Sequence, residues 1–264
     1  MKIKTAILTF LGFLILLTAV VSAFGQEKEV RLEDRRITIR MEKQPLGLIF
    51  RYLMEKYDIP IGFEESALDK YHSEYFFDTN MPAAYDGDIR HPVDELEKKA
   101  RPQTVFKANL HPITVNVENG KLTEVFDQIV PQMLYYKWEI NDNVVNIFPV
   151  QGRFDNFEKL MEMKIFEFTF EKGKTVNDIT VNIKRLPEIS RFLKENELLF
   201  RGYRPGGPWR VLGQYGRTID AEMKFSDLTF RELLNKITKV KKGGWMVSSG
   251  PVKPSGRIII DIDI

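Results

Sequence analysis

Residues 113–149 read ITVNVENGKLTEVFDQIVPQMLYYKWEINDNVVNIFP, and this stretch decides the fold because its pattern recurs along the chain. Ile113, Val115 and Val117 alternate with polar residues, which is typical of a half-buried strand. Residues 118–120 (ENG) interrupt this period and predict a turn. Four apolar residues then follow at helical spacing and predict an amphipathic helix: Leu122, Val125, Phe126 and Ile129.

A β-hairpin is predicted to close this stretch, since the runs 135–140 and 144–148 flank a polar turn at 141–143 (NDN). An earlier segment carries the same apolar spacing without a gap, at Met41, Leu46, Ile49, Phe50 and Leu53. Residues 57–63 then supply a short second strand. The repeated unit is therefore predicted to be β-α-β.

Two further copies are predicted in the second half of the chain. Residues 164–170 alternate strongly and predict a strand. Residues 179–183 (ITVNI) nearly repeat 113–117 (ITVNV), which predicts a looser copy with a strand there and a helix over 186–193. A closer last copy places seven apolar residues at the spacing of the opening stretch: Ala221, Met223, Phe225, Phe230, Leu233, Leu234 and Ile237. Strands are predicted after it at 245–247 and 258–260.

The four copies pair into two halves, which predicts an α+β fold of two small domains, each built from paired β-α-β units. The domains are expected at 27–150 and 163–264, joined by a linker at 151–162. The first is expected to carry a polar insertion at 65–110, and the second a loop at 201–217. These two irregular segments lie between the two units of each pair.

The N-terminus has the features of a secretory signal peptide over residues 1–25. Lys2 and Lys4 precede an apolar run, and small residues at 21–25 suit cleavage. The alternative is an inner-membrane anchor over residues 6–24, because this run approaches the length that crosses a bilayer. We therefore expect an exported and periplasmic protein.

Composition narrows the classes of partner and chemistry. Without Lys2 and Lys4, the 39 basic residues become 37, equal to the 37 acidic residues, which argues against a nucleic-acid partner. The chain has no cysteine, so the fold depends on its apolar core even in an oxidising compartment.

The repeated unit resembles the secretin and TonB short N-terminal domain. The resemblance covers residues 37–63 and 113–149 with its hairpin, then 221–262, and more loosely 179–196. It rests on apolar spacing and departs from the family at the segments 65–110 and 201–217. It implies a periplasmic docking module, since similar modules form rings in secretion pores, relay signals from outer-membrane receptors, or end anti-sigma regulators.

No motif predicts a catalytic or metal centre. His72, His91 and His111 lie in or beside the insertion, but they lack the spacing of metal ligands. The chain has no serine nucleophile elbow and no phosphate-binding glycine loop. We therefore expect a protein that is not an enzyme and that uses no metal or cofactor.

The most distinctive polar segment is 201–210 (RGYRPGGPWR), where guanidinium and aromatic groups lie on a glycine-rich backbone. It is suited to a carboxylate, a phosphate or a glycan ring, and the alternative is a surface loop whose tryptophan folds onto the core. The candidate binding residues are Arg201, Tyr203, Arg204, Trp209 and Arg210.

The sequence predicts a protein-interaction or assembly module of the cell envelope. Its partner would be an envelope protein or a second copy, bound by strand addition, and membrane contact would come only through an uncleaved leader. The alternative function is a periplasmic binding protein for a small ligand such as a glycan or a peptide. That alternative would use the segments 201–210 and 65–110.

Overall fold

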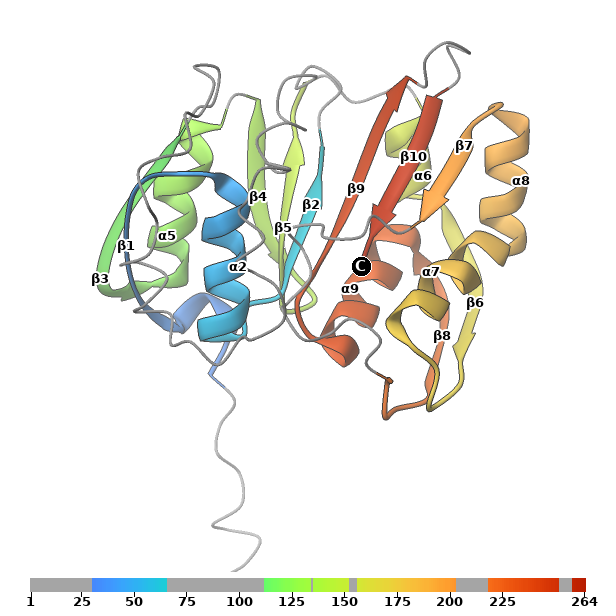
Figure 1. The fold of residues 1–264 in the computed structure, drawn as a ribbon, viewed down its shortest axis with the longest axis horizontal. Helices are drawn as coiled ribbons and strands as arrows, with labels where there is room; N and C mark the ends of the chain where they lie inside the picture. Colours follow the sequence, from blue (N-terminus) through green and yellow to red (C-terminus); the bar gives the residue numbers. More distant parts are fainter. Residues whose placement is uncertain (1–29, 66–111, 134, 152–155, 203–217, 252–257) are drawn as a thin grey trace, which may run out of the picture.

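The structure is a computed structural model that describes residues 30–65, 112–133, 135–151, 156–202, 218–251 and 258–264. Helices and strands in mixed sheets confirm the predicted α+β fold class. Figure 1 shows a six-stranded sheet through the middle of the molecule, with a two-stranded sheet on each side. The predicted leader and most of both irregular segments lie outside the described residues. No helix in the described part of the chain is long and apolar enough to cross a membrane.

The first half contains two helices between two sheets (Figure 1). Its elements are η1 (Leu32–Asp34), β1 (Arg36–Gln44), α2 (Leu46–Tyr57), β2 (Ile61–Glu64), β3 (Ile113–Lys121), α5 (Leu122–Ile129), η4 (Val130–Gln132), β4 (Tyr136–Asn141) and β5 (Val144–Pro149). β1 pairs antiparallel with β3, and β4 and β5 form the predicted hairpin. The strand, the helix and the hairpin predicted for 113–149 are therefore confirmed.

The turn predicted at 118–120 is wrong, because β3 continues through these residues to the first residue of α5. Asn119 adopts a φ of 48°, and the pairing of β1 with β3 shifts by one position beside it. Asn tolerates this left-handed conformation better than most residues. The interruption in the sequence pattern marks an irregularity within a strand.

The second half repeats the arrangement with two more α-helices, α6 and α8. Its elements are α6 (Phe157–Met161), β6 (Lys164–Phe170), α7 (Val176–Arg185), α8 (Pro187–Glu195), β7 (Leu199–Gly202), β8 (Met223–Thr229), α9 (Phe230–Lys241), β9 (Gly244–Pro251) and β10 (Ile258–Asp263). The strands predicted at 164–170, 245–247 and 258–260 are confirmed. The segment predicted as a linker contains α6, whose apolar side chains are buried in the second core.

The strand predicted at 179–183 is wrong, because these residues lie in α7. Thr175 and Asp178 form a capping box, in which the Thr175 backbone N–H donates to the Asp178 carboxylate at 2.8 Å. Val176, Ile179 and Ile183 fall on one helical face and are buried. The strand of this copy is β6, which pairs antiparallel with β8.

The two halves share the six-stranded sheet, whose order is β4-β5-β2-β9-β10-β7. Within the first half, β4 is antiparallel to β5, and β5 is parallel to β2. Within the second half, β9 is antiparallel to β10, and β10 is parallel to β7. The halves join through β2 and β9, which are parallel. The sheet therefore consists of two groups of three strands, β4-β5-β2 and β9-β10-β7. Corresponding strands come in the same order in the two groups but run in opposite directions.

The two hydrophobic cores lie on opposite faces of this sheet. Phe63 of β2 and Met246 of β9 are direct neighbours and belong to the first core, with α2 and α5. Trp245 and Val247 alternate with Met246 and belong to the second core, with α7 and α9. Because successive side chains of a strand point to opposite faces, β9 contributes to both cores. A half-turn about an axis that runs across the strands, with a shift of three strands along that axis, relates the two groups and reverses the covered face.

Candidate functional site

The predicted binding residues fall in a segment of which the structure describes only the first part. Arg201 lies in β7, where its backbone pairs with Asp261 of β10. The other four lie outside the described residues: Tyr203, Arg204, Trp209 and Arg210. The histidines at 72, 91 and 111 also lie outside. Within the described ranges, no group of three or more His, Cys, Asp or Glu residues is placed to hold a metal ion.

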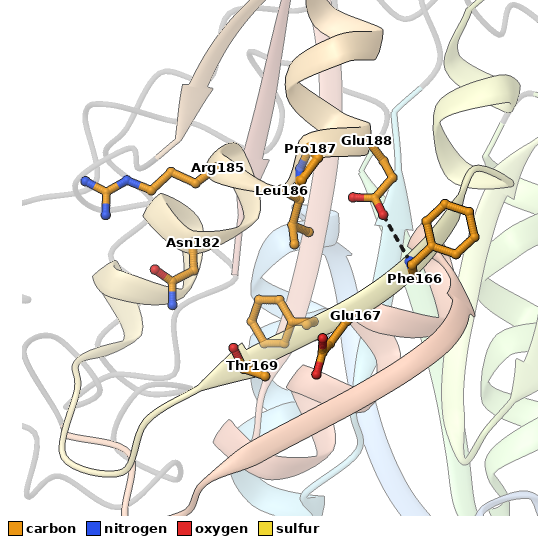
Figure 2. A pocket seen from close by; sticks show the side chains of 9 residues that line it. Phe166, Glu167, Thr169, Asn182, Arg185, Leu186, Pro187 and Glu188 are labelled. Carbon is orange, nitrogen blue, oxygen red and sulfur yellow. Dashed lines mark hydrogen bonds between the residues drawn. The ribbon is translucent and has the colours of Figure 1, made fainter.

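A groove of about 480 Å³ lies between β6 and the helices α7 and α8 (Figure 2). Its β6 side is formed by residues 166–169, with Phe168 buried and Phe166 65% exposed. Leu186 and Pro187, at the junction of the two helices, form the opposite wall. Figure 2 shows the Arg185 side chain directed away from Phe166. The groove is therefore partly apolar and follows the edge of a strand.

The edge of β6 beside this groove has no strand partner among the described residues, since β6 pairs only with β8. The Phe166 backbone N–H points away from β8 and donates to Glu188 Oε1 at 3.1 Å. Backbone groups that face a strand edge alternate along the strand. The unpaired edge therefore offers a row of main-chain donors and acceptors, of which Glu188 satisfies one.

Glu188 also carries an acceptor with no hydrogen bond. Its Oε2 atom is buried, and no donor contacts it among the described residues. A buried polar atom without a partner costs free energy, and such an atom in a groove is suited to a donor from a ligand. Glu167 supplies a second carboxylate at the groove, 3.4 Å from Lys224 Nζ.

These features together suit an extended peptide. Main-chain hydrogen bonds of an added strand would run along β6, while Phe166 and Leu186 would contact its apolar side chains. The acceptor on Glu188 would favour a donor group in the peptide. Sequence reasoning missed this groove, although it recognised the strand at 164–170. The exposure of Phe166 could not be predicted from the sequence, because Phe166 alternates with Phe168 and Phe170, which are both buried.

A second feature is the joint between the halves, where a tryptophan covers a glycine. Gly62 of β2 pairs with Trp245 of β9, which is fully buried. A Cβ atom on Gly62 would lie 2.3 Å from the indole Cε2. The indole N–H donates to Asn235 Oδ1 of α9 at 2.8 Å. The joint is thus closely packed on the face of the second core.

The joint also contains an ionic cluster around Arg231 of α9, in which Glu64 is buried and Glu162 is half exposed. Arg231 Nε donates to Glu64 Oε1 of β2 at 2.6 Å, and its Nη1 donates to Glu162. The Glu64 side chain is 1% exposed, and the guanidinium carbon lies 5.7 Å from the Phe148 ring centroid. Burial lowers the pKa of Arg231, but the hydrogen bonds and charges of Glu64 and Glu162 outweigh it and raise this pKa. The cluster joins β2, β5 and α9.

The hairpin of the first half adds polar contacts to the same helix. Asp142, in the turn between β4 and β5, accepts from Lys236 Nζ at 2.9 Å and from Lys239 Nζ at 3.3 Å. Asn235 Nδ2 donates to the Asn141 carbonyl oxygen at 3.5 Å. α9 therefore contacts the first half along its length and fixes the two halves together.

The chain was compared with protein-family models, curated proteins and solved structures. The chain matched no protein-family model. Searches of curated proteins and of solved structures also gave no match.

Proposed function

We propose that this chain is an exported, non-enzymatic protein-interaction module of the cell envelope, and that it binds an extended segment of an envelope protein by strand addition along β6. The single observation that carries the proposal is the groove in which an unpaired strand edge faces α7 and α8. The leader-like N-terminus supports export. The resemblance of the repeated unit to the secretin and TonB short N-terminal domain supports a docking role.

The exposed Phe166 is the apolar anchor in this proposal. Among the exposed large hydrophobic residues that the structure describes, Phe166 has the highest exposed fraction, 65% against 58% for Val30. An apolar ligand side chain that covered this ring would remove apolar surface from water, which favours binding. Glu188 would exchange its bond to the Phe166 N–H for a bond to the added strand. The expected ligand is an extended segment with alternating apolar and donor side chains.

A random peptide library displayed on phage, selected on the purified exported protein, tests this proposal. Selected peptides should shift the backbone amide NMR signals of residues 166–170 and should bind more weakly to Phe166→Glu. We expect a loss of about tenfold or more, because burying a Phe side chain contributes about 1.5–3 kcal/mol. The protein should show no turnover on a panel of substrates.

Val240→Glu is the matched control, since Val240 is also exposed but lies on α9, away from the groove. This variant should bind the selected peptides as the unchanged protein does. Selection of no peptide, or equal losses in both variants, would contradict a site on β6. Because Phe166 is mostly exposed, the unfolding midpoint of Phe166→Glu should stay close to that of the unchanged protein.

A further inference from the structure

The internal joint provides a template for a contact between two molecules. β2 and β9 pair in parallel, with Ile61 opposite Gly244, Gly62 opposite Trp245 and Phe63 opposite Met246. At its two ends the Ile61 N–H donates to the Gly243 carbonyl and the Glu65 N–H to the Val247 carbonyl. The edge strand β2 of the first half therefore pairs with the edge strand β9 of the second half.

β7 is the counterpart of β2 in the second half. Between the preceding helix and each strand lies a residue with a φ of 52°, Asp58 directly after α2 and Glu197 two residues after the end of α8. The next residue donates its backbone N–H to a leucine carbonyl near the end of the helix, Ile59 to Leu53 in the first half and Leu198 to Leu193 in the second. Each strand then pairs in parallel with the last strand of its half.

β4 is the counterpart of β9 in the first half. Each is the first strand of the antiparallel pair that follows a helix, α5 before β4 and α9 before β9. β9 is occupied by β2, but β4 has only β5 as a partner among the described residues. β7 likewise has only β10 as its described partner. The two edge strands of the shared sheet, β7 and β4, thus correspond to β2 and β9, the two strands that pair at the internal joint.

The strand directions allow this contact. β5, β2 and β9 run one way, and β4, β10 and β7 run the other way. Because β4 and β7 point in the same direction, a second molecule shifted along the sheet places its β4 beside β7 in parallel. This is the orientation of β2 beside β9.

We propose that copies of this chain associate head to tail, with β7 of one molecule paired in parallel with β4 of the next. The internal joint sets the alignment. Val145 lies opposite both Ile61 and Ile140, and Ile260 lies opposite both Phe200 and Ser249, so Phe200 is the counterpart of Ile61 and Ile140 is the counterpart of Ser249. Since Ile61 pairs with Gly244, Phe200 would lie opposite Tyr135 of the next molecule and Gly202 opposite Lys137. An assembly built in this way has a β4 edge at one end and a β7 edge at the other, and each can bind a further molecule. Such a heterologous contact continues as a filament or closes as a ring.

This inference deepens the proposed function by naming a second copy as a partner, and it rests on that function only through the shared mode of strand addition. The contact is expected to be weaker than the internal joint. On β4, Lys137 and Glu139 are exposed, whereas on β9 Met246 and Ser248 are buried. Charged residues on an edge strand oppose indiscriminate pairing. We therefore expect reversible association that increases with protein concentration.

Cysteine cross-linking tests the contact directly, since the unchanged chain has no cysteine. One variant carries Lys137→Cys and another carries Gly202→Cys. After mixing and mild oxidation, we expect a disulfide-linked dimer that contains one molecule of each variant. Neither variant alone should form a dimer, because the contact joins two different edges.

Glu139→Cys is the control for alignment. Residue 139 lies on the same side of β4 as residue 137 but two positions along, and a shift of about 6–7 Å exceeds the usual reach of a disulfide. The mixture of Glu139→Cys with Gly202→Cys should give little mixed dimer. The unfolding midpoint of each variant shows that it is folded, and light scattering of the unchanged protein should show a mass that rises with concentration.

Several results would overturn the inference. Dimers of one variant alone would indicate a symmetric contact, and equal cross-linking at residue 139 would indicate no fixed alignment. A mass equal to one chain at every concentration would show that the edges are not used by a second copy. Peptide binding at β6 is measured separately on the same variants, so failure of the head-to-tail contact leaves the groove proposal standing.

Discussion

At Gly62, the backbone of β2 lies directly under the indole ring of Trp245. The position has no left-handed backbone, so the need for glycine comes from space alone. Adding a Cβ atom at 2.3 Å from the ring would force the tryptophan or the strand to move. Trp245 cannot move easily, because it is fully buried and bonded to Asn235.

Gly62→Ala is therefore expected to destabilise the protein. Overpacking of a well-packed site costs typically about 1–3 kcal/mol, which urea denaturation will measure as a lower midpoint. Combining Gly62→Ala with Trp245→Phe makes a double-mutant cycle, because the smaller ring leaves space for the methyl group. The loss from Gly62→Ala should be smaller in the Trp245→Phe background. Equal losses in both backgrounds would show that the ring is not the obstacle.

This glycine also shows what could be predicted from the sequence at the scale of residues. The apolar residues of β2 were identified as a strand from their pattern, and a glycine inside a strand often marks a close approach of another group. Its partner could not be identified, because Trp245 lies in the other half of the chain. The ionic cluster of Glu64, Glu162 and Arg231 was missed for the same reason.

Among the elements, α7 depends on a cap whose strength varies with pH. The backbone N–H of Thr175, and then its hydroxyl, donate to the Asp178 carboxylate and hold the pKa of Asp178 below its usual range. A lowered pKa means that the ionised carboxylate is favoured in the folded state. Its stabilising effect is present above the usual carboxyl pKa and is lost as the pH falls through the lowered value.

Asp178→Asn is expected to reduce stability at neutral pH by about 1 kcal/mol, the usual effect of a lost cap. The difference from the unchanged protein should shrink in acid, where Asp178 of the unchanged protein becomes protonated. Urea midpoints measured from neutral pH into acid will show this convergence. Asp220→Asn is the control, since Asp220 pairs with Lys172 at an exposed site and should change little. A difference that stays constant with pH would contradict the role of the Asp178 charge.

The same helix explains one sequence-based error at the scale of elements. Residues 179–183 contain Ile, Thr and Val, whose branched side chains favour strands, and they nearly repeat a true strand at 113–117. The cap formed by Thr175 and Asp178, followed by apolar residues at helical spacing, was the better signal. At α9, Thr229 and Glu232 form a capping box ahead of apolar residues at helical spacing, and the helix lies where the apolar spacing predicted it.

For the whole molecule, the shared sheet is the feature that sequence reasoning could not supply. The pattern predicted two halves and their repeated units, but it gave no information on which strand edge meets which. Pairing of β2 with β9 depends on contacts between distant segments. The groove beside β6 depends on the path of α7 and α8, and that path was predicted incorrectly at residues 179–183.

A shared sheet with a buried joint should make the two halves unfold together. β9 contributes to both cores, so unfolding one half removes packing from the other. We expect a single thermal transition in calorimetry, with a calorimetric enthalpy equal to the van't Hoff enthalpy. Arg231→Met should weaken this coupling, because it removes the guanidinium group that links Glu64 of β2 to α9, at a loss of about 3 kcal/mol. Its transition should be broader or divided into two.

Arg185→Met is the matched control for this loss of coupling, because Arg185 is an exposed arginine on α7, which supplies no strand to the joint. This variant should keep a single transition close to that of the unchanged protein. Adding Glu64→Gln to Arg231→Met removes the buried charge and should recover part of the coupling. Two transitions in the unchanged protein would mean that the halves are independent domains, and that the contact between β2 and β9 stabilises neither core.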